Sequence, residues 1–156
     1  MEIMGLAVVI VLITIALLFT IKFVYLQPEE KGVKASYESR QLAANTINAI
    51  VQTTATQCFN HQIKKLISSC AISPASGGTI QCADGTMACE RANMLIGQLL
   101  DMTLGEWGVH YNFTAPIPDY KISYLAGNCS KSEWIQPHTS PLHTEAGTID
   151  IKLSIC

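Results

Sequence analysis

The N-terminal sequence MEIMGLAVVIVLITIALLFTIKFVYL, residues 1–26, decides the expected fold class. It has no charged residue between positions 3 and 21, and apolar residues resume after the single Lys22. Roughly 20 apolar residues match the ~30 Å hydrocarbon thickness of a bilayer, whereas a helix of a soluble domain shows a polar face. The sequence therefore predicts a hydrophobic helix over residues 1–27, placed in a membrane or in the core of a filament.

A polar segment with proline and glycine, residues 27–32, ends the apolar stretch and predicts a linker. We therefore expect two domains, the hydrophobic helix at 1–27 and an extracellular Cys-rich α+β domain at 28–156. Beyond Pro28 there are nine basic and eleven acidic residues, because Lys22 and Glu2 lie before it. This balance offers no basic patch, so nucleic acid is not an expected partner.

The spacing of apolar residues predicts the elements of the second domain: steps of three and four residues indicate helices, and alternation indicates strands. Apolar residues at helical spacing predict one long amphipathic helix from Ser36 to about Cys70. A second helix is expected to be capped by Asp84 or Thr86 and to end at Gly105. Alternating residues predict strands over 109–114, 120–124 and 148–155. Two helices and a small antiparallel sheet give an α+β domain in which helix covers the apolar face of the sheet.

Six cysteines lie in this domain without forming a Cys-x-x-Cys pair, and we treat all six as disulfide candidates: Cys58, Cys70, Cys82, Cys89, Cys129 and Cys156. An even number in a small domain favours disulfides and an oxidising exterior over zinc. The zinc alternative is supported by one feature, the spacing Cys58-x-x-His61.

The connectivity stays open, because six cysteines allow fifteen pairings. Expected proximity suggests that Cys70–Cys82 closes the loop between the helices. By the same argument, Cys58–Cys89 joins the two helices and Cys129–Cys156 joins neighbouring strands.

Two glycosylation patterns agree with an exterior location, Asn112-Phe-Thr114 and Asn128-Cys-Ser130. The basic residues near the apolar stretch, Lys22, Lys31 and Lys34, all follow it, which is the reverse of the positive-inside bias. We expect this conflict to be resolved if Met1 is the first residue after a removed leader that carried the missing basic flank.

No motif in the chain predicts catalysis, a cofactor, a metal site or a small-molecule substrate. Glycine-rich phosphate loops, nucleophile elbows and His-Glu-x-x-His patterns do not occur. The remaining candidates for a hydrolytic or metal cluster have no fixed spacing, and we interpret them as surface residues: His110, His138, His143, Asp119, Glu133 and Glu145. The chain is therefore not expected to be an enzyme.

The first 19 residues, an acidic residue followed by an unbroken apolar helix, resemble mature type IV pilins and especially archaeal pilin-like proteins. The resemblance implies that a leader is cut on the cytoplasmic side and that the helix waits in the membrane before it is extracted into a filament core. Bacterial members carry a glutamate a few positions further along, which pairs with the N-terminal amine of a neighbour. In this sequence the early acid is Glu2, so the resemblance implies that Glu2 takes this pairing role. The alternative is that Glu2 lies at the level of the lipid headgroups.

The expected function is therefore a structural subunit of a type IV pilus-like extracellular filament at the cell surface, with copies of itself as partners. The alternative is a single-pass surface protein whose exterior domain binds a ligand or another protein.

Overall fold

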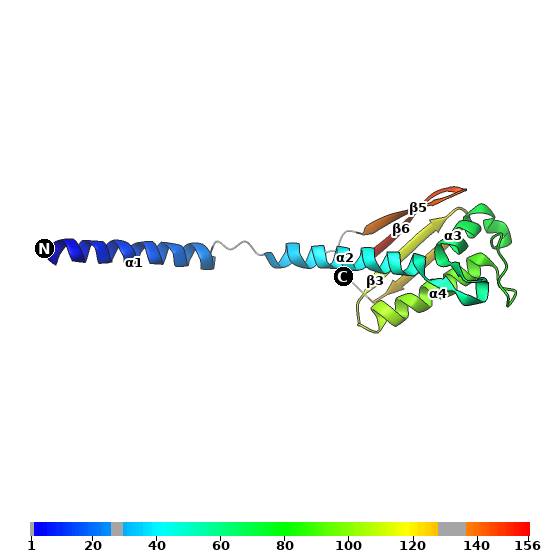
Figure 1. Cartoon of the computed structure of the whole chain (residues 1–156), viewed down its shortest axis with the longest axis horizontal. Coiled ribbons are helices and arrows are strands. Elements are labelled where there is room, and N and C mark those ends of the chain that lie inside the picture. The colour runs from blue at the N-terminus through cyan, green and yellow to red at the C-terminus, as the bar shows by residue number, and fades with distance from the viewer. Residues whose placement is uncertain (1, 26–29, 128–136) are drawn as a thin grey trace. The chain divides into compact units, whose positions relative to one another are not determined.

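The computed structural model describes residues 2–25, 30–127 and 137–156, and within them the side chains of 2–4, 6, 7, 23–25 and 30–35 lie outside the description. The chain divides into two compact units, Met1–Ala35 and Ser36–Cys156, which we call the first and the second unit and describe separately. Helices and strands are labelled in Figure 1.

The predicted fold class, a long hydrophobic N-terminal helix followed by two helices and one small sheet, is wrong. The described residues form four α-helices and two antiparallel sheets. The first helix, α1, spans Glu2–Tyr25. Over the part of the chain that the structure describes, none of the helices combines the length and the apolar character for such a crossing.

The single helix predicted from Ser36 to Cys70 is also wrong, because two helices occupy this stretch. Helix α2 (Glu30–Gln52) ends before a two-stranded sheet of β1 (Thr54–Ala55) and β2 (His61–Gln62), and α3 (Ile63–Ile72) follows. The turn between the two strands contains the short helix η1 (Thr56–Cys58). Ile47 and Ile63 are both buried, so helical spacing of apolar residues continues across a break that the pattern cannot reveal.

The predicted second helix is confirmed, although its predicted cap is not. After the short helix η2 (Pro74–Ser76), α4 spans Ala88–Leu100 and continues as a π-helical turn, η3 (Asp101–Gly105). The N-cap residue is Met87, whose side chain makes no capping bond. Asp84 instead accepts hydrogen bonds from the backbone N–H (3.1 Å) and the hydroxyl (2.6 Å) of Thr86, because a short Asx turn competes with the capping role.

Four strands form the main sheet, in the order β4-β3-β6-β5 with all neighbours antiparallel. The three predicted strands are confirmed as β3 (Tyr111–Ile117), β4 (Tyr120–Ala126) and β6 (Gly147–Ile155), and the sequence missed β5 (His138–Thr144). Strand β5 contains Pro141 and lies at one edge, where a missing N–H costs no ladder hydrogen bond.

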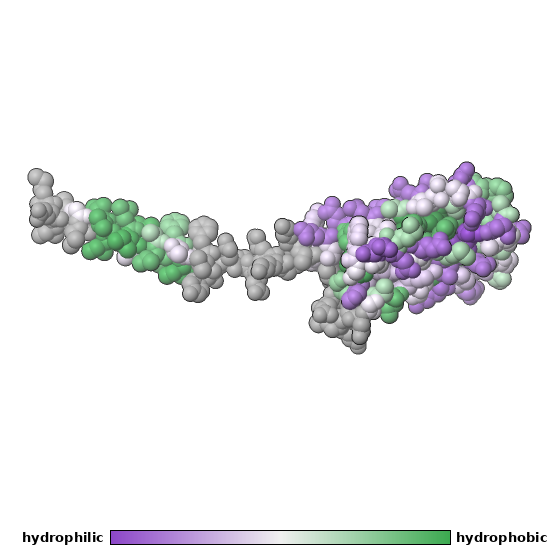
Figure 2. All heavy atoms as spheres, turned by 90° about the horizontal axis from the view of Figure 1, so that it is seen from below, coloured by the Kyte–Doolittle hydropathy of each residue, from purple (hydrophilic) through white to green (hydrophobic). Residues whose placement is uncertain are grey.

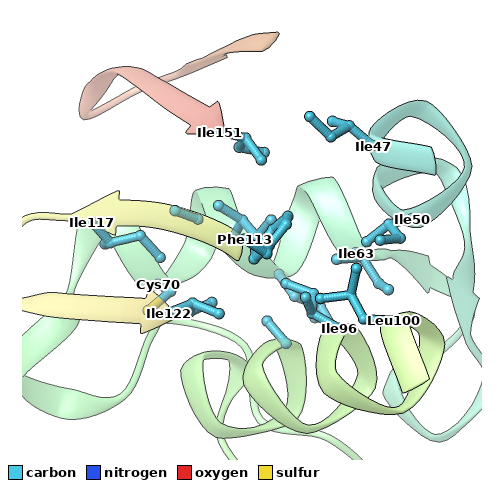
Figure 3. Packing of buried hydrophobic residues seen from close by; sticks show 14 of the residues in the cluster. Ile47, Ile50, Ile63, Cys70, Ile96, Leu100, Phe113, Ile117, Ile122 and Ile151 are labelled. Carbon is cyan, nitrogen blue, oxygen red and sulfur yellow. The ribbon is translucent and has the colours of Figure 1, made fainter. Parts of the chain in front are cut away.

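One core lies between α2, α3 and α4 and a single face of this sheet (Figures 1 and 3). Every second residue of β6, from Ile149 to Ile155, is buried, as the sequence predicts. Ile47 of α2, Ile63 of α3 and Ile96 of α4 converge on Phe113 and Ile151 of the sheet, as Figure 3 shows. The opposite face of the sheet carries mostly exposed or half-buried polar residues.

Candidate functional site

The first unit presents an apolar surface on α1, made of eleven large side chains. Their exposed fractions run from 45% at Ile15 to 66% at Leu18. Figure 2 shows the described part of this helix as an almost unbroken hydrophobic surface in that view. We call this set the α1 surface: Val8, Val9, Ile10, Val11, Leu12, Ile13, Ile15, Leu17, Leu18, Phe19 and Ile21. Fully burying one such side chain stabilises a protein by about 1.5–3 kcal/mol, so this surface favours association.

Both threonines of α1, Thr14 and Thr20, hydrogen-bond to the backbone of their own helix. The Thr14 hydroxyl donates to the carbonyl of Val11 at 2.9 Å, and the Thr20 hydroxyl donates to that of Ala16 at 2.8 Å. A hydroxyl bonded in this way can enter an apolar environment without losing a hydrogen bond. The α1 surface is therefore compatible with complete removal from water. The side chain of Glu2, the predicted N-terminal pairing residue, lies outside the described residues.

Disulfide bonds join residues of the second unit, but two of the three predicted pairings, Cys70–Cys82 and Cys58–Cys89, are wrong. The bonds are Cys58–Cys82 and Cys70–Cys89, with Cα atoms 4.2 Å and 4.9 Å apart. Cys156 is disulfide-bonded too, while its predicted partner Cys129 lies outside the described residues. Since Cys58 is bonded to Cys82, the alternative in which Cys58 and His61 bind zinc does not hold.

Hydrogen bonds in the loop after α3 explain these pairings. The backbone N–H groups of Thr79 and Ile80 donate to the Ser69 hydroxyl oxygen at 2.8 Å and 2.9 Å, which folds the loop back onto α3. Cys89 N–H then donates to the carbonyl of Gly77, so the first turn of α4 lies beside Cys70. Gly78 permits this approach, because a Cβ there would lie 2.8 Å from the Cβ of Ala88.

A second set of bonds places the other cysteine pair. The N–H of Ala83 donates to the carbonyl of Gln57 at 2.8 Å, which brings the adjacent Cys82 to Cys58. The chain adopts left-handed backbone angles at Phe59 (φ 54°) and Asn60 (φ 57°) directly after Cys58. Phe59 is a bulky residue for that region and its side chain is 66% exposed. Local sequence gives no signal for either contact, so the pairing was not predictable by proximity.

Among the described residues of the second unit, one basic side chain is buried, and the sequence did not predict it. Arg91 of α4 is 6% exposed and forms an ion pair with Asp84. Its Nε–H donates to the Thr86 hydroxyl at 3.2 Å. Burial of an arginine requires such partners, and neither the charge count nor the helical period distinguishes this arginine from a solvated one.

Two tyrosines attach α4 and its π-helical turn to the sheet. The Tyr111 hydroxyl donates to Oδ1 of Asp101 at 3.0 Å, and the Tyr124 hydroxyl donates to the carbonyl of Asn93 at 2.6 Å. The pKa of Tyr111 is raised to about 12. Burial is the largest cause, and the hydrogen bond to Asp101 is the second. Burial also raises the pKa of Tyr124. Both groups are therefore neutral hydrogen-bond donors at physiological pH.

The remaining predicted positions do not converge on one site. His110 precedes β3, whereas His138 and His143 lie on β5 at an edge of the sheet. Within residues 2–25, 30–127 and 137–156, no three His, Cys, Asp or Glu side chains are grouped to hold a metal ion. Asp119 and Glu145 lie in the two hairpin turns, and Glu133 is outside the described residues.

Of the two glycosylation candidates, only Asn112 is described. It lies on β3, opposite Leu125 of β4 and Ser154 of β6, and it alternates with the buried Tyr111 and Phe113. Its side chain therefore belongs to the face of the sheet that the helices do not cover, as the alternation predicts, and it is half-buried there. Asn128 lies outside the described residues.

Comparison of the chain with protein families, with curated proteins and with solved structures finds no significant match. The resemblance to pilins therefore stays a prediction.

Proposed function

We propose that this chain is a structural subunit of a pilus-like extracellular filament, in which α1 helices of many copies pack together and the second units form the outer surface. The observation that carries the proposal is the α1 surface, where apolar side chains on all sides of one helix are about half exposed. A single flat contact would leave most of such a helix in water. Packing among several copies buries it on every side.

The internal bonds of Thr14 and Thr20 support this arrangement. In an apolar core, each unpaired hydroxyl would cost about 1–3 kcal/mol. Both hydroxyls have partners within α1, so no neighbouring copy has to supply one. The association therefore rests on apolar packing alone along the described part of the surface.

The disulfides support the extracellular part of the proposal. Bonds such as Cys58–Cys82 and Cys70–Cys89 persist in oxidising surroundings and are rare in the cytosol. A cell-surface or extracellular location follows as part of the same proposal. Enzyme activity is not part of it.

Negative-stain microscopy of material sheared from the cell surface tests the proposal. We expect regular fibres that contain the wild-type chain, and we expect Leu12→Glu to abolish them, because a carboxylate on the α1 surface would be buried without a partner. Ser123→Glu is the matched control, since it adds the same charge at an exposed position on β4 of the second unit.

Three outcomes separate the alternatives. Fibres from wild type and Ser123→Glu but not from Leu12→Glu support the filament. Unchanged fibres from Leu12→Glu contradict the role assigned to the α1 surface. Wild-type chain found only as detergent-soluble particles favours the alternative, a surface protein held at the membrane by its N-terminal segment.

A further inference from the structure

A polar groove lies in the second unit between the β1–β2 hairpin and α4. It encloses about 390 Å³, near the lower end of the range for small-molecule sites. Its polar rim consists of exposed side chains from both walls: Thr54, Thr56 and Gln57 on one side and Gln98 on the other. Arg91 and Met94 of α4 line the groove between them.

The charge of this groove is balanced internally. Arg91 is ion-paired with Asp84, and no other charged side chain is among the residues described around the groove. An anionic ligand would have to compete with Asp84 for the guanidinium. A neutral ligand meets no such competitor, so the groove favours a neutral molecule.

The hydrogen-bonding groups of the groove both donate and accept. Hydroxyls and side-chain amides have both capacities, as the two threonines and the two glutamines provide here. The Arg91 guanidinium has five N–H donors, and its described contacts, to Asp84, Thr86 and the sulfur of Met94, use three of them. Sugar hydroxyls also donate and accept, and the C–H face of a sugar ring can pack against an apolar side chain such as Met94.

Both walls of the groove are held by covalent bonds. Gln57 directly precedes Cys58, which is bonded to Cys82, and its carbonyl accepts the Ala83 N–H. Arg91 lies two residues after Cys89, which is bonded to Cys70. A preformed site loses less conformational entropy when it binds a ligand, so both disulfides contribute to the groove as well as to stability.

We infer that this groove is a binding site for a neutral saccharide, of the size of one sugar ring or a disaccharide. Gln57, Gln98 and the free N–H groups of Arg91 bind the ligand's hydroxyls, and Met94 packs against its C–H face. The inference concerns the second unit alone and does not depend on filament formation, because binding can be measured on dispersed chains.

Saturation-transfer NMR with the full, disulfide-bonded chain in detergent tests this inference. The probes are glucose, galactose, mannose, N-acetylglucosamine and lactose, each at a concentration of about 10 mM, which is well above a Kd of ~1 mM. We expect saturation of at least one probe. We expect Gln98→Glu and Gln57→Ala each to weaken its binding about tenfold, which corresponds to the loss of ~1.4 kcal/mol.

Gln41→Glu is the matched control, because it makes the Gln98→Glu change at an exposed position on α2 outside the groove. Thermal unfolding of each variant shows that it is folded. Normal binding by Gln41→Glu with weakened binding by both groove variants supports the site. The inference is overturned if no sugar is saturated, if sulfate displaces the bound sugar at equal concentration, or if Gln41→Glu weakens binding as much as Gln98→Glu.

Discussion

The contact between Gly97 of α4 and the ring of Tyr124 predicts that Gly97→Ala destabilises the second unit. A Cβ at Gly97 would lie 2.8 Å from two carbon atoms of the ring and 2.9 Å from its hydroxyl oxygen. The ring cannot move away freely, because this hydroxyl donates to the carbonyl of Asn93. The substitution therefore forces either the ring or α4 to shift.

Opposing terms set the size of the effect. Alanine is favoured over glycine inside a helix by about 1 kcal/mol. Overpacking costs about 1–3 kcal/mol, and loss of the Tyr124 hydrogen bond costs a further ~1 kcal/mol. The free energy of unfolding should therefore fall by about 1–3 kcal/mol, although the substitution raises the helix propensity of α4.

A double-mutant cycle checks the assigned cause. In a Tyr124→Ala background the clash is absent. The change in the free energy of unfolding caused by Gly97→Ala should therefore reverse its sign, and the substitution should stabilise the protein by up to ~1 kcal/mol. Urea unfolding followed by near-ultraviolet circular dichroism measures all four proteins. Gly105→Ala is the control, because a Cβ there meets its nearest atoms at 3.8 Å, an ordinary contact distance. Equal destabilisation by Gly97→Ala in both backgrounds would refute the reasoning.

Three further predictions follow from the same structure. Replacing Cys70 and Cys89 together by alanine should lower the free energy of unfolding by about 3 kcal/mol, from the separation of 19 residues, and an unchanged urea midpoint would contradict this. The pKa of Tyr111 is about 12 in the folded state against 10.0 ordinarily, so wild-type stability should fall as pH rises from 10.0 to about 12. Tyr111→Phe should lessen that fall in alkaline unfolding experiments, and an equally steep fall in the variant would exclude Tyr111 as its source. Ile96→Ala at a fully buried site should lower the free energy of unfolding, measured by thermal denaturation, by about 2–5 kcal/mol. Met94→Ala at a 41% exposed site should lower the same free energy by under about 1 kcal/mol. Similar losses at both sites would contradict the burial argument.

The strands were largely predictable, because alternation in an antiparallel sheet with one buried face repeats every two residues. Residues 149–155 show this pattern clearly, and they form β6 with its apolar positions buried. Strand β5 escaped prediction because it lies at an edge, where its alternate side chains are only half-buried and Pro141 is tolerated. Edge position is a tertiary property that the local pattern does not contain.

The helices and the disulfides were less predictable, for a related reason. Helices α2 and α3 face the same core, so their apolar spacing continues through the turn at Phe59 and Asn60 and hides the break. The two incorrect cysteine pairs, Cys70–Cys82 and Cys58–Cys89, were predicted from the expected proximity of the loop ends and of the two helices. The actual pairs depend on hydrogen bonds to Ser69 and Gln57 that bring separate segments together. The periodicity of the sequence does not predict these bonds.

The candidate site divides in the same way. The composition of residues 8–21 shows directly that α1 is apolar. The structure adds that the large apolar side chains of α1 are about half exposed. The groove at Arg91 could not be predicted, because its walls come from the β1–β2 hairpin and α4, which are far apart in the sequence.

The interleaved order of Cys58–Cys82 and Cys70–Cys89 has a consequence for the lifetime of the protein among secreted proteases. Residues 74–79 lie inside both rings, between Cys70 and Cys82. A cut there leaves Cys58 and Cys70 on one fragment and Cys82 and Cys89 on the other, so two sulfur bridges still hold the fragments together. A nicked molecule would keep its full mass until it is reduced, and an assembly built from it would not shed pieces at this loop.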